Sequence, residues 1–298
     1  MEELQNMDRE YVTRPSNMKK MSFYSVFRHI GLGLLAEYYT ITNQLSFANR
    51  NRIQFLCLHH LFPVEEKPFD LLLTTLMREH KFISYSEAVE RILKGPIDRP
   101  YIVLSFDDGI KNCLRAVEIM NRYGAKACFF VCPHIIGKDD PFIIKEFCVN
   151  NLHMPPGEFL SWADLEFIVR NGHEVGSHTL RHYNAADLTK NEGLVEISKS
   201  FDMLCLRLGS TKHFAWPFGR FSDFNESARR AVFEVGYRSC ASGERGCHTV
   251  VTNSTPEKLC IRRDHVIPSW PIDHILFFLA RNYKTSSYET NHWPYDIK

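Results

Sequence analysis

Residues 101–109 read Tyr-Ile-Val-Leu-Ser-Phe-Asp-Asp-Gly, an apolar run that ends in two adjacent carboxylates. An apolar run of this length, followed by a glycine, predicts a buried β-strand and then a turn. Two like charges at the end of a buried strand repel each other, so their presence requires a reason. We therefore expect that a metal ion takes one carboxylate of the pair Asp107 and Asp108, or that one of them acts as a base.

Two histidines, His178 and His182, stand four residues apart in the segment Ser-His-Thr-Leu-Arg-His at residues 177–182. In a helical turn this spacing places both imidazoles on one face. Together with Asp108 they would form a three-ligand set for a zinc-type site that keeps one coordination position open. The alternatives are a turn or helix cap at Asp107 and Asp108, and two ordinary core or surface histidines.

Predicted strands and helices alternate from about residue 52 onward. The strands cover residues 53–58, 81–83, 101–106, 127–131, 173–176, 213–216, 237–239 and 259–262. The helices cover residues 69–79, 86–94, 112–123, 162–171, 190–208, 222–235 and 272–282, and residues 133–160 form a less regular insertion. This order favours a single (β/α) barrel-like domain. Functional side chains of such barrels follow the strands, as His59, Asp107, His178 and Pro217 do here.

The charges of the chain are balanced, with 36 Lys and Arg against 35 Asp and Glu and a net charge of +1. This balance shows no excess of basic residues of the kind that binds nucleic acid. It also argues against a strongly polyanionic polymer as an obligate ligand. The nine cysteines are scattered and form no Cys-x-x-Cys pair. That usage is typical of reduced, buried thiols in a cytoplasmic protein and argues against a thiol-ligated zinc site.

An N-terminal helical extension, residues 1–50, precedes the α/β pattern of residues 51–298. Residues 18–48 read as an amphipathic helix that we expect to dock on the main domain, with peripheral contact to a membrane surface or a partner as the alternative. Arg28 and His29 interrupt its apolar stretch, and no small-x-small cleavage site follows, so a signal peptide is not predicted. No stretch approaches the length of a membrane-spanning helix, and we expect a cytoplasmic location.

Four segments together resemble the polysaccharide deacetylase family (carbohydrate esterase family 4). They are Leu-Ser-Phe-Asp-Asp-Gly at 104–109, Ala-Cys-Phe-Phe-Val at 127–131, Gly-His-Glu-Val-Gly-Ser-His-Thr-Leu-Arg-His at 172–182 and Phe-Ala-Trp-Pro-Phe-Gly at 214–219. The resemblance covers roughly residues 52–270. It implies the family's distorted (β/α) barrel and a metal-dependent hydrolase that acts on an acylated sugar.

The resemblance also implies roles for single residues. Asp108, His178 and His182 would bind a divalent metal ion, with Zn²⁺ expected, and Asp107 would be the general base that deprotonates a metal-bound water. The segment around Pro217 and Phe218 would contribute the Phe218 backbone N–H to stabilise the tetrahedral oxyanion. His173, in the same motif as the two histidine ligands, corresponds to a structural residue of the family.

Two features depart from the common family pattern. Ala215 stands where the family more often has an arginine that orients the base, so Asp107 needs another cationic partner, and Arg262 or Arg263 could supply it. The family's Leu-x-His segment is not evident near the C-terminus, but Phe-Leu-Cys-Leu-His-His-Leu at 55–61 resembles an early histidine segment of some members. We therefore expect His59 as the general acid, with His60 second and His265 third.

The sequence thus predicts a hydrolase that removes an N-acetyl group, or less favourably an O-acetyl group, from a carbohydrate or glycan precursor. A lipid-linked or nucleotide-linked cytoplasmic intermediate would fit the balanced charge. One alternative is a catalytically degenerate family member that binds glycan without turnover. Another is a hydrolase of a non-sugar amide.

Overall fold

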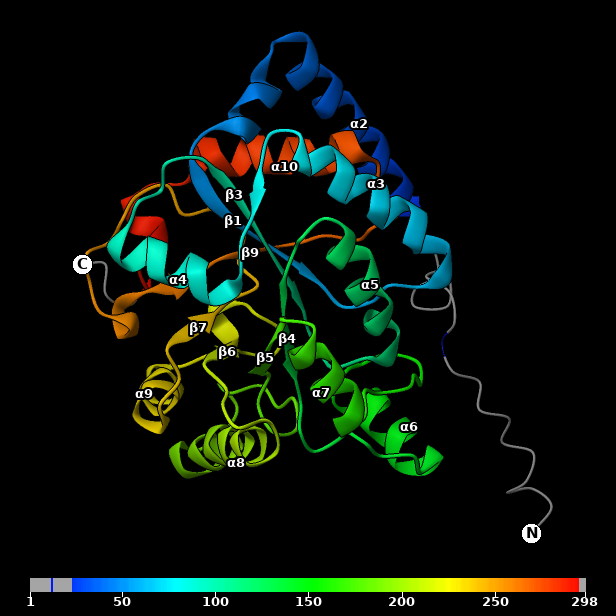
Figure 1. Ribbon diagram of the computed structural model, residues 1–298, viewed down its shortest axis with the longest axis vertical. Helices are drawn as coiled ribbons and strands as arrows, with labels where there is room; N and C mark the ends of the chain where they lie inside the picture. Colours follow the sequence, from blue (N-terminus) through cyan, green and yellow to red (C-terminus); the bar gives the residue numbers. More distant parts are fainter. Residues whose placement is uncertain (1–11, 13–22, 295–298) are drawn as a thin grey trace, which may run out of the picture.

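The computed structural model describes residue 12 and residues 23–294 and confirms the predicted (β/α) barrel (Figure 1). In the described part, parallel strands follow the order β8-β7-β6-β5-β4-β3-β1-β9, and β2 pairs with the first part of β3. The strands are β1 (Arg52–Leu58), β2 (Lys81–Phe82), β3 (Pro100–Phe106), β4 (Ala127–Val131), β5 (Glu174–Ser177), β6 (His213–Ala215), β7 (Ser239–Ala241), β8 (Cys260–Ile261) and β9 (Arg263–His265). The two ends of this order, β8 and β9, are separated by Arg262 alone, so the chain itself closes the barrel.

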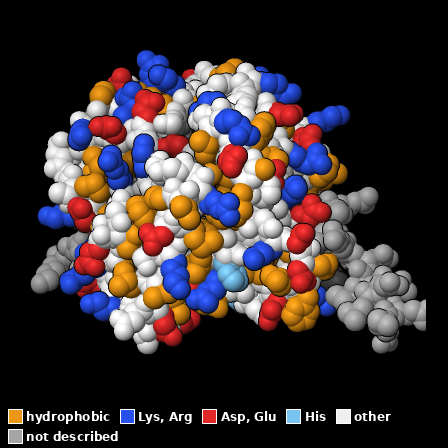
Figure 2. Space-filling view, turned by 60° about the horizontal axis from the view of Figure 1, so that its bottom comes forward, with side chains coloured by type: hydrophobic (Ala, Val, Ile, Leu, Met, Phe, Trp, Pro, Cys, Tyr) orange, Lys and Arg blue, Asp and Glu red, His pale blue; other side chains and the backbone are white. Residues whose placement is uncertain are grey.

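Helices surround the strands on the outside (Figure 1). They are α2 (Phe23–Ile41), α3 (Glu66–Met77), α4 (Tyr85–Lys94), α5 (Arg115–Arg122), α6 (Pro141–Asn150), α7 (Trp162–Arg170), α8 (Lys190–Leu208), α9 (Glu226–Val235) and α10 (Ile272–Thr285). On the face drawn in Figure 2, basic and acidic side chains are interspersed, in keeping with the net charge of +1.

The alternation of side chains along the strands divides the core into two layers. In β3, Tyr101 and Val103 point into the barrel, where they pack with Phe55 and Phe130. The intervening residues Ile102, Leu104 and Phe106 point outward to the layer beneath α3 and α5. Continued past Phe106, the alternation directs Asp107 toward the inner side of the barrel mouth.

Helix α6 is a correction to the irregular insertion expected at residues 133–160. Asp140 caps the helix by accepting hydrogen bonds from the backbone N–H groups of Phe142 and Ile143, and Pro141 occupies the first turn. The apolar residues of α6 do not form a single helical stripe: Phe142 is exposed while Ile144 and Phe147 are buried. The helical period was therefore weak in the sequence.

Helix α2 packs on α10, as the docking hypothesis for the N-terminal extension expected (Figure 1). Ala36 is buried against Phe277 and Phe278, and the rings of His29 and His274 stack with centroids 5.8 Å apart. Residues 18–22 of the predicted helix lie outside the described residues. Within the part of the chain that is described, none of the helices combines the length and the apolar character needed to cross a membrane.

Candidate active site

A cavity of about 550 Å³ opens at the carboxyl ends of the strands. It brings together most of the residues that the sequence singled out, from His59 to His265. Those predicted residues that line it are His59, His60, Asp107, Asp108, His178, His182, Phe218, Arg263 and His265. Parallel strands present their carboxyl ends at one rim of a barrel, which explains this convergence.

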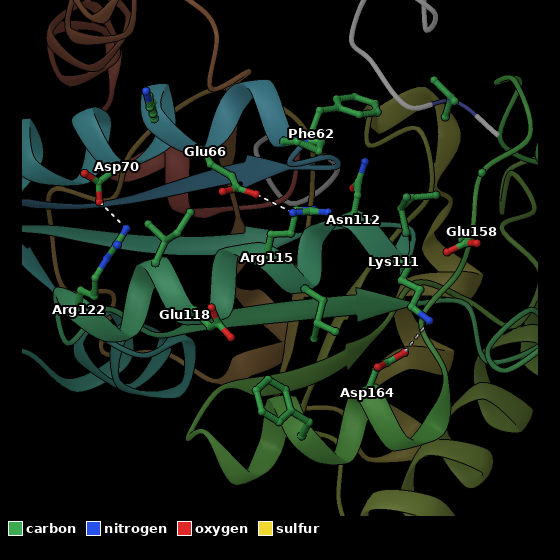
Figure 3. A pocket seen from close by; sticks show the side chains of 18 of the residues that line it. Phe62, Glu66, Asp70, Lys111, Asn112, Arg115, Glu118, Arg122, Glu158 and Asp164 are labelled. Carbon is green, nitrogen blue, oxygen red and sulfur yellow. Dashed lines mark hydrogen bonds and ion pairs between the residues drawn. The ribbon is translucent and has the colours of Figure 1, made fainter.

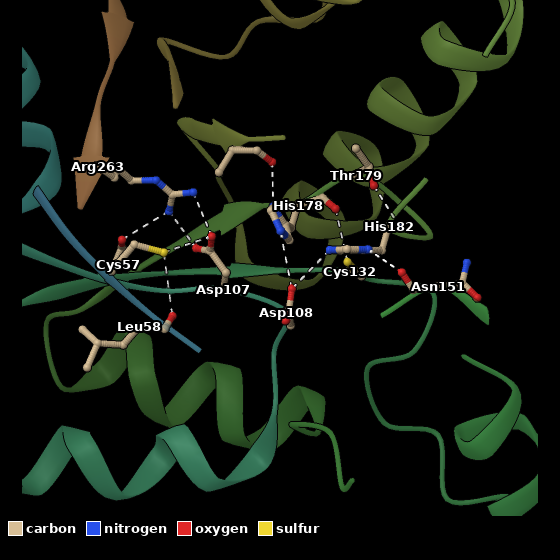
Figure 4. Close-up of polar contacts among 12 residues, drawn as sticks. Cys57, Leu58, Asp107, Asp108, Cys132, Asn151, His178, Thr179, His182 and Arg263 are labelled. Atoms are coloured by element: carbon tan, nitrogen blue, oxygen red, sulfur yellow. Dashed lines mark hydrogen bonds and ion pairs between the residues drawn. The ribbon is translucent and has the colours of Figure 1, made fainter. Parts of the chain in front are cut away.

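Asp108 and the two histidines form a compact group (Figure 4). Asp108 Oδ1 lies 3.5 Å from His178 Nε2 and 3.4 Å from His182 Nε2. His178 Nδ1 donates a hydrogen bond to the Ala215 carbonyl at 2.7 Å, and His182 Nδ1 donates one to the Asn151 carbonyl at 2.9 Å. Because carbonyl oxygens only accept, both Nδ1 atoms carry the proton and both Nε2 lone pairs face Asp108.

Burial sets the charge state of this group. It lowers the pKa of His178 to about 4, so the imidazole is neutral near pH 7, as a metal ligand must be. Burial acts to raise the pKa of the Asp108 carboxyl, but the neighbouring His182 and His59 hold it well below its ordinary value. Asp108 Oδ1 is nevertheless buried without a hydrogen-bond partner among the described residues.

The loop that carries the two histidines is not the helical turn expected from their spacing. Thr179 and His182 both have left-handed backbone conformations, with φ of 64° and 62°. The His182 N–H donates to Thr179 Oγ1 at 2.9 Å, and the Arg181 side chain pairs with the buried Glu196 of α8. These tertiary contacts replace the helical hydrogen bonds and still bring the two imidazole rings to 5.0 Å.

Backbone strain is concentrated at this cavity. Seven described residues other than glycine have a clearly positive φ. Five of the seven line the cavity or belong to the histidine loop: Asp108, His153, Thr179, His182 and Phe218. Such conformations cost of order 1–3 kcal/mol each and persist where surrounding contacts enforce them, which is typical of functional sites.

Asp107 is bound by Arg263 (Figure 4). The guanidinium donates to Asp107 Oδ1 at 2.7 Å and to Oδ2 at 2.8 Å, and the Cys57 thiol donates to Oδ2 at 3.2 Å. Burial acts to raise the pKa of the Asp107 carboxyl, but Arg263, with His178, lowers the pKa to about 2. Asp107 is therefore ionised throughout the physiological range.

Arg262, which was expected to take part in the site, lies outside it, and this position corrects that expectation. Its Nε donates to the Thr290 carbonyl at 3.0 Å, and its guanidinium lies over the Phe221 ring. Neighbouring residues of an extended chain point to opposite faces, so Arg263 turns into the barrel and Arg262 turns outward. Of the two arginines considered, Arg263 contacts the base candidate.

The three candidate acids lie at the same rim but differ in environment. Burial and the neighbouring His59 lower the pKa of His60 to about 4 and that of His265 to about 3. Both are therefore neutral near pH 7. The half-buried His59 packs edge-on against His265, with ring centroids 5.0 Å apart.

The segment around Pro217 turns sharply at the cavity wall. Pro217 is buried and is not among the residues that line the cavity, whereas the Phe218 ring is 46% exposed and packs edge-on against His182. Gly219 has φ of 78°, and a Cβ there would lie 2.6 Å from the backbone nitrogen of Gly243. This backbone contact holds Phe218 beside the histidine pair.

Comparison with known proteins identifies a family for part of the chain. Residues 94–240 match the family model described as polysaccharide deacetylase. These residues belong to the polysaccharide deacetylase family. No curated protein matches its sequence.

Solved structures of other proteins share the fold. IcaB from Ammonifex degensii superposes with a TM-score of 0.62 at 18% identity, over 77% of this chain and 97% of that protein. The deacetylase PplD from Streptococcus pyogenes, solved with acetate, gives 0.59 at 19% identity, over 78% and 98%. A de-N-acetylase from Aggregatibacter actinomycetemcomitans gives 0.56 at 16% identity, over 76% and 99%.

The sequence does not predict some residues at the candidate active site. The sequence marks Cys57 only as a buried thiol, although it stands on β1 two residues before the expected acid His59. His153 and Met154, which line the cavity, and Asn151, whose carbonyl accepts from His182, come from the insertion, where no motif marks them. His173 lies outside the cavity, and its Nδ1 accepts a hydrogen bond from the Ala127 N–H at 3.1 Å.

A second and larger hollow runs along α3, α5 and α7 on the outside of the barrel (Figure 3). Most of the cationic side chains in it pair with acidic neighbours: Arg115 with Glu66, Arg122 with Asp70, and Lys111 with Asp164. Because these partners largely neutralise one another, the hollow offers little net charge to a ligand. The cavity with the Asp108 group is the candidate active site.

Proposed function

We propose that this protein is a metal-dependent hydrolase that removes an N-acetyl group from a carbohydrate or glycan precursor. The observation that carries the proposal is the buried Asp108 Oδ1, which faces two imidazole Nε2 atoms and lies beside an ionised Asp107. This oxygen has no hydrogen-bond donor among the described residues, and a bound cation would supply the missing partner.

The donor set fits a divalent cation. Asp108, His178 and His182 each offer one ligand atom, and these atoms lie within 4.8 Å of one another. Two imidazole nitrogens and one carboxylate oxygen suit Zn²⁺ with an open position. A backbone carbonyl oxygen accepts from the Nδ1 of each histidine and so fixes its tautomer, as is usual for metal-binding histidines. When bound, the cation would polarise the acyl carbonyl and lower the pKa of a water molecule.

Asp107 acts as the general base in this proposal. Arg263 and Cys57 fix the orientation of its carboxylate, and the Arg263 charge keeps the carboxylate ionised in a buried place. It takes the proton from the water that attacks the acyl carbonyl. General base catalysis of this kind contributes about 10²–10⁴-fold to the rate.

The other steps are assigned to Phe218 and His59. The Phe218 backbone N–H donates to the oxygen of the tetrahedral intermediate, where a fixed donor stabilises the developing charge. His59 gives a proton to the leaving amine. His60 and His265 are the second and third candidates for proton donation, and burial together with the neighbouring His59 lowers their pKa values to about 4 and about 3.

The departure at Ala215 favoured a degenerate, glycan-binding family member. Arg263 supplies the positive charge that the arginine at this position provides elsewhere in the family, and the Ala215 carbonyl still orients His178. Catalysis is therefore the better supported function. The nine free cysteines, eight of them buried, suit the reducing cytoplasm that we propose for the protein and its glycan precursor.

Metal content and acetate release together test the proposal. We expect stoichiometric zinc in chelator-free protein and acetate release from N-acetylated sugars. Asp107→Asn should keep the metal and lose at least about 10²-fold in kcat, whereas Asp108→Asn should lose the metal as well. Bound metal without release of any acyl group would indicate a binding protein. Release from simple amides but not from sugars would indicate a non-sugar substrate, and full activity without metal would contradict the mechanism.

A further inference from the structure

The outer face of α2 carries a continuous row of exposed apolar side chains. Phe27 is 68% exposed, Leu34 64% and Ile41 77%, and Ile30 and Tyr38 lie between them on the same face. We call these five residues the α2 stripe. Their spacing of three or four residues places them along one side of the helix, over a length of about 21 Å. We propose that the α2 stripe binds the surface of an anionic lipid bilayer.

The stripe is not needed to hold α2 in the fold. The opposite side of the helix already packs on α10, through Ala36 against Phe277 and Phe278 and through His29 against His274. A helix that is apolar on both sides is expected to have a second apolar neighbour. Since α2 is not long and apolar enough to span a bilayer, the geometry suits a helix that lies in the interface.

The charges around the stripe favour an anionic lipid surface over a neutral one. Residues 11–41 contain four basic residues, Arg14, Lys19, Lys20 and Arg28, against one acidic residue, Glu37, and Arg28 packs over Trp270. The stripe itself contains no charged residue. Basic residues close in sequence to an apolar helix are the combination that binds anionic lipids, because each lysine or arginine adds electrostatic attraction to the burial of the apolar side chains.

The first half of α2 is linked to the wall of the candidate active site. The Arg28 guanidinium lies over the Trp270 ring at 5.8 Å, and Trp270 packs edge-on against His265, which lines the cavity. Docking of α2 would hold this cavity near the lipid surface and favour a lipid-linked glycan as the substrate. That last consequence, unlike the docking itself, rests on the proposed function.

Vesicle co-sedimentation of the full chain tests the docking without any substrate. We compare vesicles of phosphatidylcholine with vesicles that also contain phosphatidylglycerol. Wild type should bind the anionic vesicles more tightly, and added salt should weaken the binding. The double variant Leu34→Glu, Ile41→Glu should bind at least about 100-fold more weakly, because two apolar side chains no longer enter the lipid.

Leu206→Glu is the matched control, because Leu206 is an exposed leucine of α8, 84% exposed and outside the stripe. It should bind vesicles like wild type. Lys19→Ala should weaken binding to the anionic vesicles roughly fivefold. Both glutamate variants replace exposed residues, so their thermal unfolding should match that of wild type and exclude misfolding as the cause.

Three results would overturn the proposal: no vesicle binding by wild type, equal binding to both kinds of vesicle, or unchanged binding by the Leu34→Glu, Ile41→Glu variant. Sedimentation equilibrium adds a further outcome. If wild type dimerises without binding vesicles and the double variant is monomeric, the stripe is a self-association surface and the lipid proposal fails. Acetate release from a soluble sugar should be unaffected in every variant, so these results are independent of the hydrolase proposal.

Discussion

Arg263 donates to both carboxylate oxygens of Asp107, at 2.7 and 2.8 Å, across the mouth of the barrel. The arginine comes from β9 and the aspartate follows β3, with β1 between the two strands. Ala215 of β6 carries no charge, so the cation beside Asp107 comes from β9 instead. The same chemical requirement is met by a different strand.

Replacement of Arg263 by methionine should lower kcat at least about 100-fold with little change in KM. The variant leaves the Asp107 carboxylate buried without its cation and free to turn away from the attacking water. Loss of one partner of a buried pair should also cost about 3–5 kcal/mol in the free energy of unfolding. Steady-state kinetics and urea unfolding measure the two effects.

Arg262→Met provides the matched control, because Arg262 is the next residue and has the same side chain. Its loss removes a hydrogen bond to the Thr290 carbonyl and should cost about 1 kcal/mol of stability, with kcat nearly unchanged. If the two variants had equal kcat values, the assignment of Arg263 as the partner that positions Asp107 would be wrong.

Replacement of His59 by alanine should affect amide substrates far more than activated esters. An amine leaves only after it gains a proton, whereas a nitrophenolate leaves without one. We expect kcat for an N-acetylated sugar to fall at least about 100-fold, while hydrolysis of p-nitrophenyl acetate changes much less. Release of acetate and of nitrophenolate measures both reactions with one protein preparation.

His60→Ala and His265→Ala serve as controls in the same assay, because both side chains line the cavity near His59. Their amide and ester rates should change in parallel. A selective loss of amide hydrolysis in either of them, with His59→Ala unaffected, would move the acid role to that residue.

Gly219→Ala should disturb the cavity wall, since its Cβ would lie 2.6 Å from the backbone nitrogen of Gly243. The Gly243 backbone cannot rotate away as a flexible side chain can, so the turn that carries Phe218 must move. We expect a loss of several kcal/mol in stability and a fall in kcat. Gly124→Ala is the control: its φ is also positive, at 62°, but nothing lies within 4 Å of the added Cβ, so it should cost about 1–2 kcal/mol.

Acid should destabilise the protein from about pH 6.5 downward. Burial lowers the pKa values of His80, His173 and His248 to about 4 each. Unfolded histidines take up protons near pH 6.5, whereas these three do so near pH 4. Between those values the unfolded chain binds more protons, so the free energy of unfolding falls as the pH falls.

Each of the three histidines should contribute on the order of 3 kcal/mol to this fall. Urea unfolding of metal-free protein between pH 7.5 and pH 4.5 measures how the free energy of unfolding changes with pH. The slope gives the number of protons taken up on unfolding, and His248→Gln should reduce that number by about one. A free energy of unfolding that stays constant between pH 7 and pH 5 would contradict the burial argument.

Most of the barrel could be predicted from the sequence, because its signals are local. Strand and helix periods identified β1, β3, β4 and the helices beside them, and strands of five to seven residues are long enough for a clear pattern. Helix α6 was missed because its apolar residues form no stripe. The predicted strand at 259–262 contains only β8, and β9 begins beyond it at Arg263. These strands of two and three residues are too short to reveal an inward face.

By itself the sequence determined which residues carry the chemistry: the Asp107 and Asp108 pair after a buried strand, and the histidines that follow the strand ends. The tertiary structure decided how they are held. Whether Arg263 or Arg262 faces Asp107 depends on where the chain crosses from β8 to β9, and the shape of the histidine loop depends on Asn151 and Glu196. Residue type and spacing are local properties, whereas strand pairing and loop contacts join residues that are far apart in the chain.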